Sequence, residues 1–280
     1  MLSNIKKYFI TYNHNTYIVQ HTTSNIYDKE YNSFKIGQNY DNYINISVIN
    51  QNTADISHIK YEPECGLKTL LTRGADTVEM ITLSLQIVKN KVPAVRYYQF
   101  DDMSNIECHE LLNTKPPRNS VKPIPLNALY IVLHGKTWYE HYFNARMRDA
   151  NKYKIYRDKI SKLYSEFDSK ILADIIRDIE IINRLAVYFK TDISWIEFFN
   201  LIPHNKRCIV LYGWLNNFIK IFLEDTFFSN NWIIDIDKIK QIPITITQSG
   251  GGKIKPHNNK KSRIVFSNEY YHLPYDTYYM

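Results

Sequence analysis

Residues 70–80, LLTRGADTVEM, combine residue types that suit phosphate binding. Arg73 supplies a positive charge, and Gly74 and Ala75 are small enough for a phosphate to approach the backbone closely. The first N–H groups of a helix are unpaired and lie at the positive end of its dipole, so a helix beginning here would attract an anion. The residues that could contact a pyrophosphate are Arg73, Gly74, Ala75, Asp76 and Thr77. Alternatively, Gly74 only allows a tight turn from strand to helix, and Arg73 is solvated.

Strand-like sequence precedes this loop. Alternating or continuous β-branched and aromatic residues predict short strands separated by Asn and Gly clusters, and the close spacing favours antiparallel pairing. The predicted strands are Lys7–Tyr12, Thr16–His21, Ser33–Ile36, Tyr43–Asn50 and Asp55–Tyr61.

Helical sequence follows the loop. Apolar residues recur on one helical face from Val78 to Val88, and Asp76 is a suitable N-cap with Glu79 three residues later. Pro93 ends this helix, and the next seven residues, AVRYYQF, predict a strand.

Two further short elements are predicted after a proline-rich loop at residues 111–125. Leu126–Leu133 has helical spacing, although a strand through Ala128–Leu133 is the alternative. The T-x-x-E pair of Thr137 and Glu140 is typical of a capping box and predicts a helix from Trp138 to Met147.

The pattern becomes amphipathic and helical after about residue 149, and strand-like again near residue 235. The helical segments are Tyr153–Phe167, Ile171–Tyr188, Ile193–Leu201 and Arg207–Phe222, and a strand is expected over Asp235–Thr247. The sequence therefore predicts an α/β domain at 1–148, a helical section at 149–230, and a strand with a basic arm, hinged at Gly250–Gly252, at 231–280.

The order strand, glycine-containing loop, helix, strand, helix and tyrosine-containing segment resembles the core of the GNAT acetyltransferase superfamily. Arg73-Gly74-Ala75 resembles the end of the family's pyrophosphate-binding loop. The string WYEHYF, residues 138–143, is similar to the family's YEKxGF-like string, with Tyr142 where the glycine would stand. The resemblance covers about residues 1–147. It implies a mixed, mainly antiparallel sheet with flanking helices.

The same resemblance implies an acyl-coenzyme A-dependent N-acyltransferase with acetyl-CoA as cofactor and an amine as acceptor. Such a reaction needs a base for the amine and an acid for the leaving thiolate. By position, Tyr139 is the candidate acid, and Glu62 and Glu64 are candidate bases. Alternatively, Tyr139 is a packed aromatic and the two glutamates are surface carboxylates. His58 and His134 are further candidate bases, although a lone histidine is more often structural. No metal site is expected.

The net charge of +7 is concentrated near the C-terminus. No acidic residue occurs between Asp237 and Glu269, whereas the rest of the chain holds equal numbers of acidic and basic residues. This arm could bind nucleic acid or an acidic protein, or it could be solvated. The residues that would make such contacts are Lys253, Lys255, Lys260, Lys261 and Arg263.

A second resemblance concerns the strings LTRGADTVEM, FDDMS and HGKTWYEHYF, which are similar to uncharacterised proteins of large cytoplasmic DNA viruses. It implies a host-cytoplasmic, viral-factory or virion setting. The alternative function is therefore a non-catalytic viral scaffold protein that uses a GNAT-like fold. The chain has no run of about 18 apolar residues, so no membrane association is expected. Three widely spaced cysteines predict a reducing compartment without disulfides.

Overall fold

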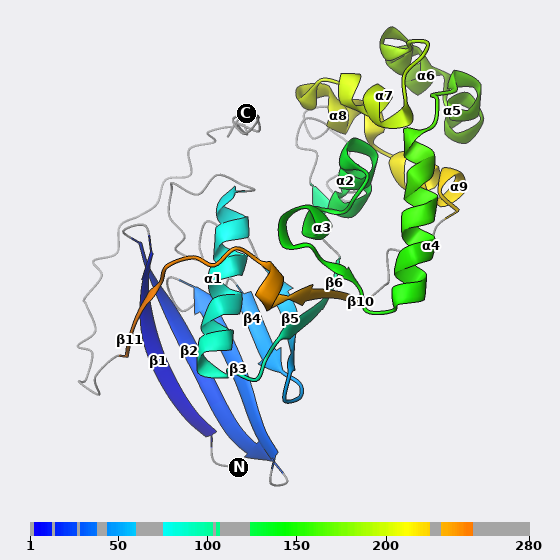
Figure 1. The fold of residues 1–280 in the computed structure, drawn as a ribbon. Coiled ribbons are helices and arrows are strands. Elements are labelled where there is room, and N and C mark those ends of the chain that lie inside the picture. The colour runs from blue at the N-terminus through cyan, green and yellow to red at the C-terminus, as the bar shows by residue number, and fades with distance from the viewer. Residues whose placement is uncertain are drawn as a thin grey trace, which may run out of the picture. The chain divides into compact units, whose positions relative to one another are not determined.

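The computed structural model describes residues 3–12, 15–26, 29–37, 44–59, 75–102, 105–106, 124–224 and 231–248. Within these ranges nine strands join one sheet in the order β11-β1-β2-β3-β4-β5-β6-β10-β9. Their bounds are β1 (Ser3–Tyr12), β2 (Asn15–Ile26), β3 (Lys29–Gly37), β4 (Ile44–Val48), β5 (Thr53–Ile59), β6 (Tyr97–Asp101), β9 (Arg146–Met147), β10 (Asn231–Asp235) and β11 (Thr245–Gln248). The predicted mixed α/β fold with a mainly antiparallel sheet is confirmed (Figure 1).

The chain divides into two compact units. Unit 1 comprises Met1–Tyr98 with Ile239–Met280, and unit 2 comprises Gln99–Lys238. The sequence divided the chain by helix and strand content into 1–148, 149–230 and 231–280. That these three segments are separate domains stays a prediction.

Unit 1 is built on the antiparallel strands β1 to β5, each of which pairs with the next. Alternate side chains of each strand are buried on one face, for example Tyr8 and Ile10 on β1 and Phe34 and Ile36 on β3. The five predicted strands are confirmed in place and order. This register makes one face of the sheet apolar along most of its length.

Strand β11 lies beside β1, so the sequence-distant Thr245 and Thr11 are cross-strand partners. The single strand predicted over Asp235–Thr247 is wrong. Strand β10 ends at Asp235, a short 3-10 turn at Ile236–Lys238 follows, and β11 begins at Thr245. The chain leaves one position in the sheet and joins the sheet again at β1, which a continuous strand could not do.

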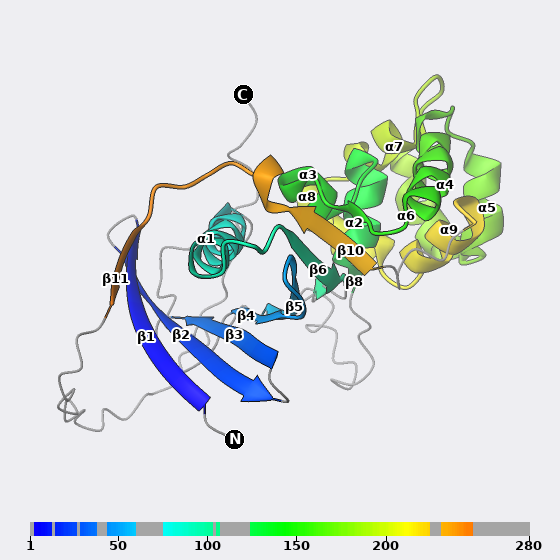
Figure 2. The same cartoon turned by 60° about the horizontal axis from the view of Figure 1, so that its bottom comes forward.

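Helix α1 (Ala75–Lys91) lies against the concave face of this sheet (Figure 2). Every residue from Met80 to Val88 is buried, so the helix is covered on all sides and not on one amphipathic face. On the side away from the sheet, the segment that leads to β11 crosses the helix, and Gln86 Nε2 donates to Gln241 Oε1 at 2.7 Å. The buried hydroxyl of Tyr98 donates to Leu85 O at 2.6 Å.

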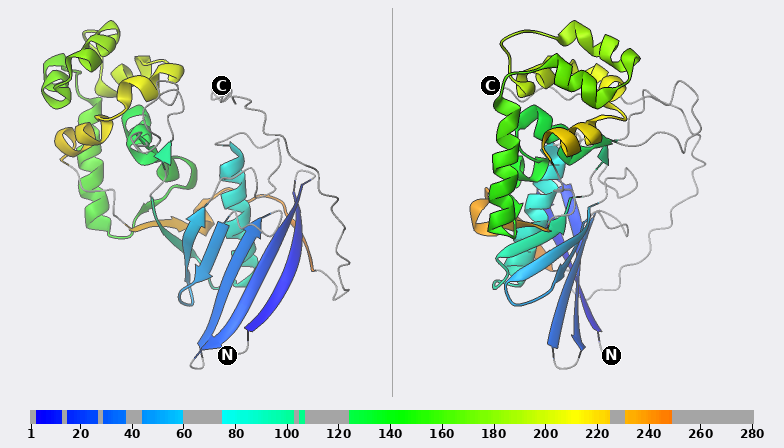
Figure 3. Two further views of the ribbon diagram at one scale, coloured as in Figure 1. Left: turned by 180° about the vertical axis from the view of Figure 1, so that it is seen from behind. Right: turned by 90° about the vertical axis from the view of Figure 1, so that its right-hand side faces the viewer.

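The helices of unit 2 can be followed in Figure 3. They are α2 (Leu126–His134), α3 (Trp138–Phe143), α4 (Ala150–Ile160), α5 (Ser169–Ile176), α6 (Ile179–Leu185), α7 (Trp195–Leu201), α8 (His204–Leu211) and α9 (Leu215–Phe222). The choice of a helix over a strand at Leu126–Leu133 is confirmed, and Gly135 ends α2 with a φ of 64°. Two short strands, β7 (Asn105–Ile106) and β8 (Ile124–Pro125), form a separate pair.

Three predicted helices are shorter than the sequence pattern indicated. The segment Ile171–Tyr188 is broken at Arg177, whose φ is 55°, and Asp178 then caps α6. The segment Arg207–Phe222 is divided near Gly213, whose φ is 84°. Helix α3 ends at Phe143 and not at Met147, because Asn144 takes a left-handed conformation.

The prediction of unpaired cysteines is wrong for Cys208, which is disulfide-bonded. The cysteines therefore give no argument for a reducing compartment. Cys65, Cys108 and the predicted basic arm lie outside the described residues. Within the described ranges, no helix has the length and apolarity needed to cross a bilayer.

The all-round burial of α1 predicts that substitutions on opposite sides of the helix are both costly. Leu83 and Leu85 project about 200° apart and are 1% and 0% exposed. We expect Leu83→Ala and Leu85→Ala each to lower the free energy of unfolding by about 2–5 kcal/mol in urea denaturation. Asn90→Ala, at an exposed position of the same helix, is the control. A leucine variant that matches this control would show that its side of α1 is not buried.

Candidate functional site

The strand–helix–strand connection β5–α1–β6 contains the predicted phosphate-binding segment. The backbone N–H groups of Arg96 and Tyr97, at the start of β6, donate to Asn52 O, just before β5, at 2.8 and 2.9 Å. Helix α1 returns the chain from the end of β5 to this point, so β5 and β6 run in the same direction. In such a unit the N-terminus of the helix follows the carboxyl end of the first strand, where α/β proteins commonly bind ligands.

Helix α1 begins at Ala75, directly after the predicted Arg73-Gly74. Arg73 and Gly74 lie outside the described residues, as do the side chains of Ala75 and Asp76, whereas Thr77 is half-buried in the first turn. Asp76 is inside the helix and not at the N-cap position that the sequence predicted.

The C-terminal end of α1 carries positive charge. Its last turn carries Lys89 and Lys91. Lys89 Nζ donates to Pro93 O at 2.8 Å, and Lys91 Nζ lies 4.0 Å from the ring centroid of Tyr8. These cations lie at the negative end of the helix dipole, where positive charge is stabilising.

The candidate acid Tyr139 and the candidate bases Glu62 and Glu64 fall in different units. Glu62 and Glu64 lie outside the described residues, as does the side chain of His58. Tyr139 lies in α3, in unit 2, and is only 7% exposed. Its ring packs against Phe100 with a centroid separation of 4.2 Å and edge-on against Trp138 at 4.9 Å. A packed aromatic environment therefore surrounds the candidate acid.

The residue after Tyr139 forms a polar centre that sequence reasoning identified only as a cap. Glu140 is buried, and the capping box with Thr137 is confirmed: Thr137 N donates to Glu140 Oε2 at 2.8 Å. Tyr153 and Tyr156, on α4, also donate their hydroxyls to this carboxylate, with Tyr153 at 2.9 Å. Both carboxylate oxygens are thus engaged, and they connect α3 to α4.

Arg157 completes the Glu140 centre. Its Nη1 donates to Gly135 O at 2.7 Å and lies 3.5 Å from Glu140 Oε1. Burial, and then the charge of Glu140, raise the pKa of Tyr153 to about 12, and the same causes raise the pKa of Tyr156 well above its ordinary value. Both phenols therefore remain donors at neutral pH. The spacing of Tyr153, Tyr156 and Arg157 on one helical face was the only sequence signal of this centre.

A second cluster joins α2 and α3 through aromatic and imidazole rings. His134 lies between Tyr130 and His141, with ring centroids 5.0 and 5.4 Å away. Burial, then the neighbouring His141, Arg207 and Lys136, lower the pKa of His134 to about 4. A neutral imidazole at physiological pH could act as a base, so His134 stays a candidate general base. Its ring packs here among other rings.

The described residues offer no metal centre, because no group of three or more His, Cys, Asp and Glu side chains gathers there. Comparisons of the chain with protein-family models, with curated proteins and with solved structures gave no match.

The contacts of Glu140 predict that replacing the capping-box glutamate costs much more stability here than in an exposed capping box. In Glu140→Gln one buried acceptor becomes a donor, so at least one of its hydrogen bonds is lost. We expect a loss of about 1–3 kcal/mol in the free energy of unfolding. The control is Glu197→Gln, in the exposed capping box of Ser194, which should leave the urea midpoint nearly unchanged. Equal effects at the two sites would contradict the proposed role of the tyrosine contacts.

His134 predicts a stability that falls with falling pH. Its folded pKa of about 4 is lower than the unfolded value of about 6.5, so the unfolded chain binds more protons between these two values. Stability contributed by the neutral imidazole is full above pH 6.5 and is lost as the pH falls toward 4. The slope is at most about 1.4 kcal/mol per pH unit.

The measurement for His134 is urea denaturation of the wild type and of His134→Asn across this pH range. The difference between the two free energies should grow with pH between 4 and 6.5, since only the wild type carries the imidazole. A constant difference across the range would exclude a depressed pKa at His134.

Proposed function

We propose that the β5–α1–β6 segment binds the pyrophosphate of an acyl-coenzyme A and that the protein is an N-acyltransferase-like enzyme. The observation that carries this proposal is the position of Ala75. Helix α1 begins there, immediately after Arg73-Gly74 and after the carboxyl end of β5. Backbone amides, a small residue and an arginine at one helix N-terminus suit a pyrophosphate.

Further support comes from the order of elements. After α1 come β6, α2 and the tyrosine-bearing α3, the order on which the GNAT resemblance rests. The helix dipole also makes the N-terminus of α1 the end that attracts anions. Residues Arg73 to Thr77 would hold the cofactor, and the cofactor would supply the activated acyl group.

The proposed reaction is direct attack of an amine on the thioester carbonyl. The C–N bond forms and the C–S bond breaks. Such a reaction needs a base for the proton that the amine nitrogen loses and an acid for the departing thiolate. The GNAT resemblance gives these roles to Glu62 or Glu64 and to the hydroxyl of Tyr139. The acceptor class is a small-molecule or protein amine.

The packing of Tyr139 favours a second candidate, a non-catalytic scaffold protein of a large DNA virus. Tyr139 is 7% exposed and its ring packs against Phe100, Trp138 and Phe143. This packing alone accounts for a tyrosine at this position, without a catalytic role. In this reading the protein acts in the host cytoplasm or virion, and the residues from Lys253 to Arg263 bind nucleic acid or an acidic protein through their positive charge.

Calorimetric titration with acetyl-CoA tests the first candidate. We expect saturable binding that Arg73→Glu abolishes, because the substitution places a negative charge beside the pyrophosphate. Lys89→Glu, a charge reversal at the other end of the same helix, should bind as the wild type does. Pantetheine, which lacks the pyrophosphate, should bind weakly and equally to all three proteins.

The outcomes separate the two candidates. Binding that Arg73→Glu abolishes, together with acetyl transfer to an amine that Tyr139→Phe slows, supports the enzyme. Binding without transfer supports a scaffold that retains the ligand. If the folded wild type does not bind acetyl-CoA at millimolar concentration, the acyltransferase proposal is wrong, and binding of a labelled oligonucleotide becomes the next measurement.

A further inference from the structure

A polar cluster ends the otherwise apolar face of the unit 1 sheet. The strand register places Lys6 opposite His21 and Asn4 opposite Thr23. On the other side of β2, Thr23 is opposite Asn32 and Asn25 is opposite Glu30. Because alternate residues share a face, these side chains gather where β1 begins, β2 ends and β3 begins.

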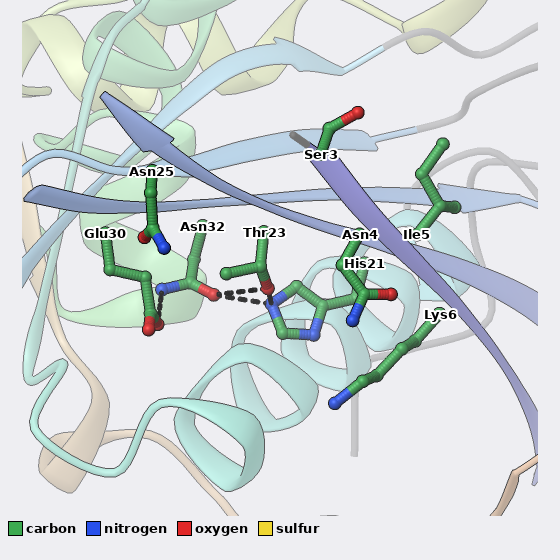
Figure 4. A pocket seen from close by; sticks show the side chains of 9 residues that line it. All are labelled: Ser3, Asn4, Ile5, Lys6, His21, Thr23, Asn25, Glu30 and Asn32. Atoms are coloured by element: carbon green, nitrogen blue, oxygen red, sulfur yellow. Dashed lines mark hydrogen bonds between the residues drawn. The ribbon is translucent and has the colours of Figure 1, made fainter. Parts of the chain in front are cut away.

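The cluster lines an open pocket of about 620 Å³, shown in Figure 4. Beside His21, its polar lining includes Asn4, Lys6, Asn25, Glu30 and Asn32. His21 forms the boundary between the pocket and the core, because its ring stacks on Phe34 with a centroid separation of 4.2 Å and an interplanar angle of 8°.

A chain of hydrogen bonds determines which nitrogen of His21 carries the proton. Asn32 Nδ2 donates to Glu30 Oε1 at 2.8 Å, since a carboxylate can only accept. The amide oxygen of Asn32 therefore faces His21 and accepts from its Nε2 at 2.6 Å. Nε2 must carry the proton, so Nδ1 is left with a lone pair. This assignment follows from the network of partners.

Nδ1 of His21 is buried and has no hydrogen-bond partner among the described residues, and the side chain as a whole is only 8% exposed. An unpaired buried acceptor is costly, and native proteins rarely keep one without a reason. Burial lowers the pKa of His21, with Lys6 and Lys91 acting in the same direction, which keeps the ring neutral. A ligand that donates one hydrogen bond would satisfy this nitrogen.

The charges of the pocket restrict the ligand. Among the described residues that line the pocket, Lys6 and Glu30 carry the formal charges, which are opposite in sign. An anion would meet Glu30, and a cation or metal ion would meet Lys6. The remaining groups are amides and hydroxyls, which both donate and accept, as vicinal hydroxyl groups do. A neutral ligand with several hydroxyls matches these groups.

We propose that this pocket binds a saccharide unit, with one sugar hydroxyl donating to His21 Nδ1 and the side chains of Asn4, Asn25 and Glu30 contacting others. The site is separate from the proposed coenzyme A site. Lys91, the last residue of α1, contacts Tyr8 beside His21, whereas the coenzyme A segment is at the first residue, about 25 Å along this 17-residue helix. The saccharide proposal therefore does not depend on the acyltransferase proposal.

Nuclear magnetic resonance of the full chain tests the site. A long-range ¹H–¹⁵N spectrum should show His21 neutral and protonated on Nε2. Titration with glucose, galactose, mannose and N-acetylglucosamine at millimolar concentrations should move the Nδ1 resonance upfield with at least one sugar, and should move the side-chain amides of Asn25 and Asn32. Glycine and inorganic phosphate should leave these resonances in place.

Two variants separate binding from folding. His21→Phe keeps a ring against Phe34 but removes Nδ1. We expect this variant to bind the sugar roughly ten-fold more weakly, or worse. Thr22→Ala, on the opposite face of the same strand, should bind as the wild type does. Unchanged affinity in a folded His21→Phe protein would overturn the proposal. So would a neutral His21 that carries its proton on Nδ1, a response to glycine or phosphate in place of sugars, or no response to any sugar in the panel.

Discussion

Burial of the middle of α1, from Met80 to Val88, is the constraint on which unit 1 depends. The helix lies between the concave face of the sheet and the segment leading to β11, and every residue in this stretch is buried. Apolar burial of this extent contributes most of the free energy that such a unit can gain. The buried hydroxyls on the helix are bonded within it, Ser84 Oγ to Met80 O at 2.7 Å and Thr82 Oγ1 to Val78 O at 2.8 Å, whereas Gln86 bonds to Gln241 outside it. The helix axis is thereby held against the sheet, and each end of α1 meets a different polar region.

These two regions differ in their physical character. The N-terminus of α1 is the positive end of the helix dipole, the kind of position that attracts a phosphate group. Near its C-terminus the sheet carries a hydrogen-bonded chain from Glu30 through Asn32 to His21. The chain leaves a neutral nitrogen as an acceptor. In unit 2 the Glu140 carboxylate has the opposite property, since both of its oxygens are already bonded and it holds helices together. A buried polar group can thus serve ligand binding or stability, according to whether its partners are complete.

Local pattern predicted most of the elements but not where each of them stopped. Strands β1 to β5, helix α1 and the Thr137–Glu140 cap follow from alternation, helical spacing and capping chemistry, which act over a few residues. The same patterns merged α5 with α6 and α8 with α9, because an amphipathic stripe continues through Arg177 and Gly213 while the backbone there turns to positive φ. The uniform burial of α1 was also invisible, since it depends on a segment about 155 residues further along the chain.

The sequence by itself determined the fold class and the order of strands and helices up to α3, except for the short strands β7 and β8, which fell on segments without a strand pattern. Tertiary structure alone decided that β11 pairs with β1, that Tyr153 and Tyr156 donate to Glu140, and that His21 lies between Lys6 and Phe34. The physical reason is the range of the interactions. Propensity, capping and periodicity act between near neighbours in the chain, whereas register and the partners of a buried polar group are set by strands and helices that meet only when the chain has folded.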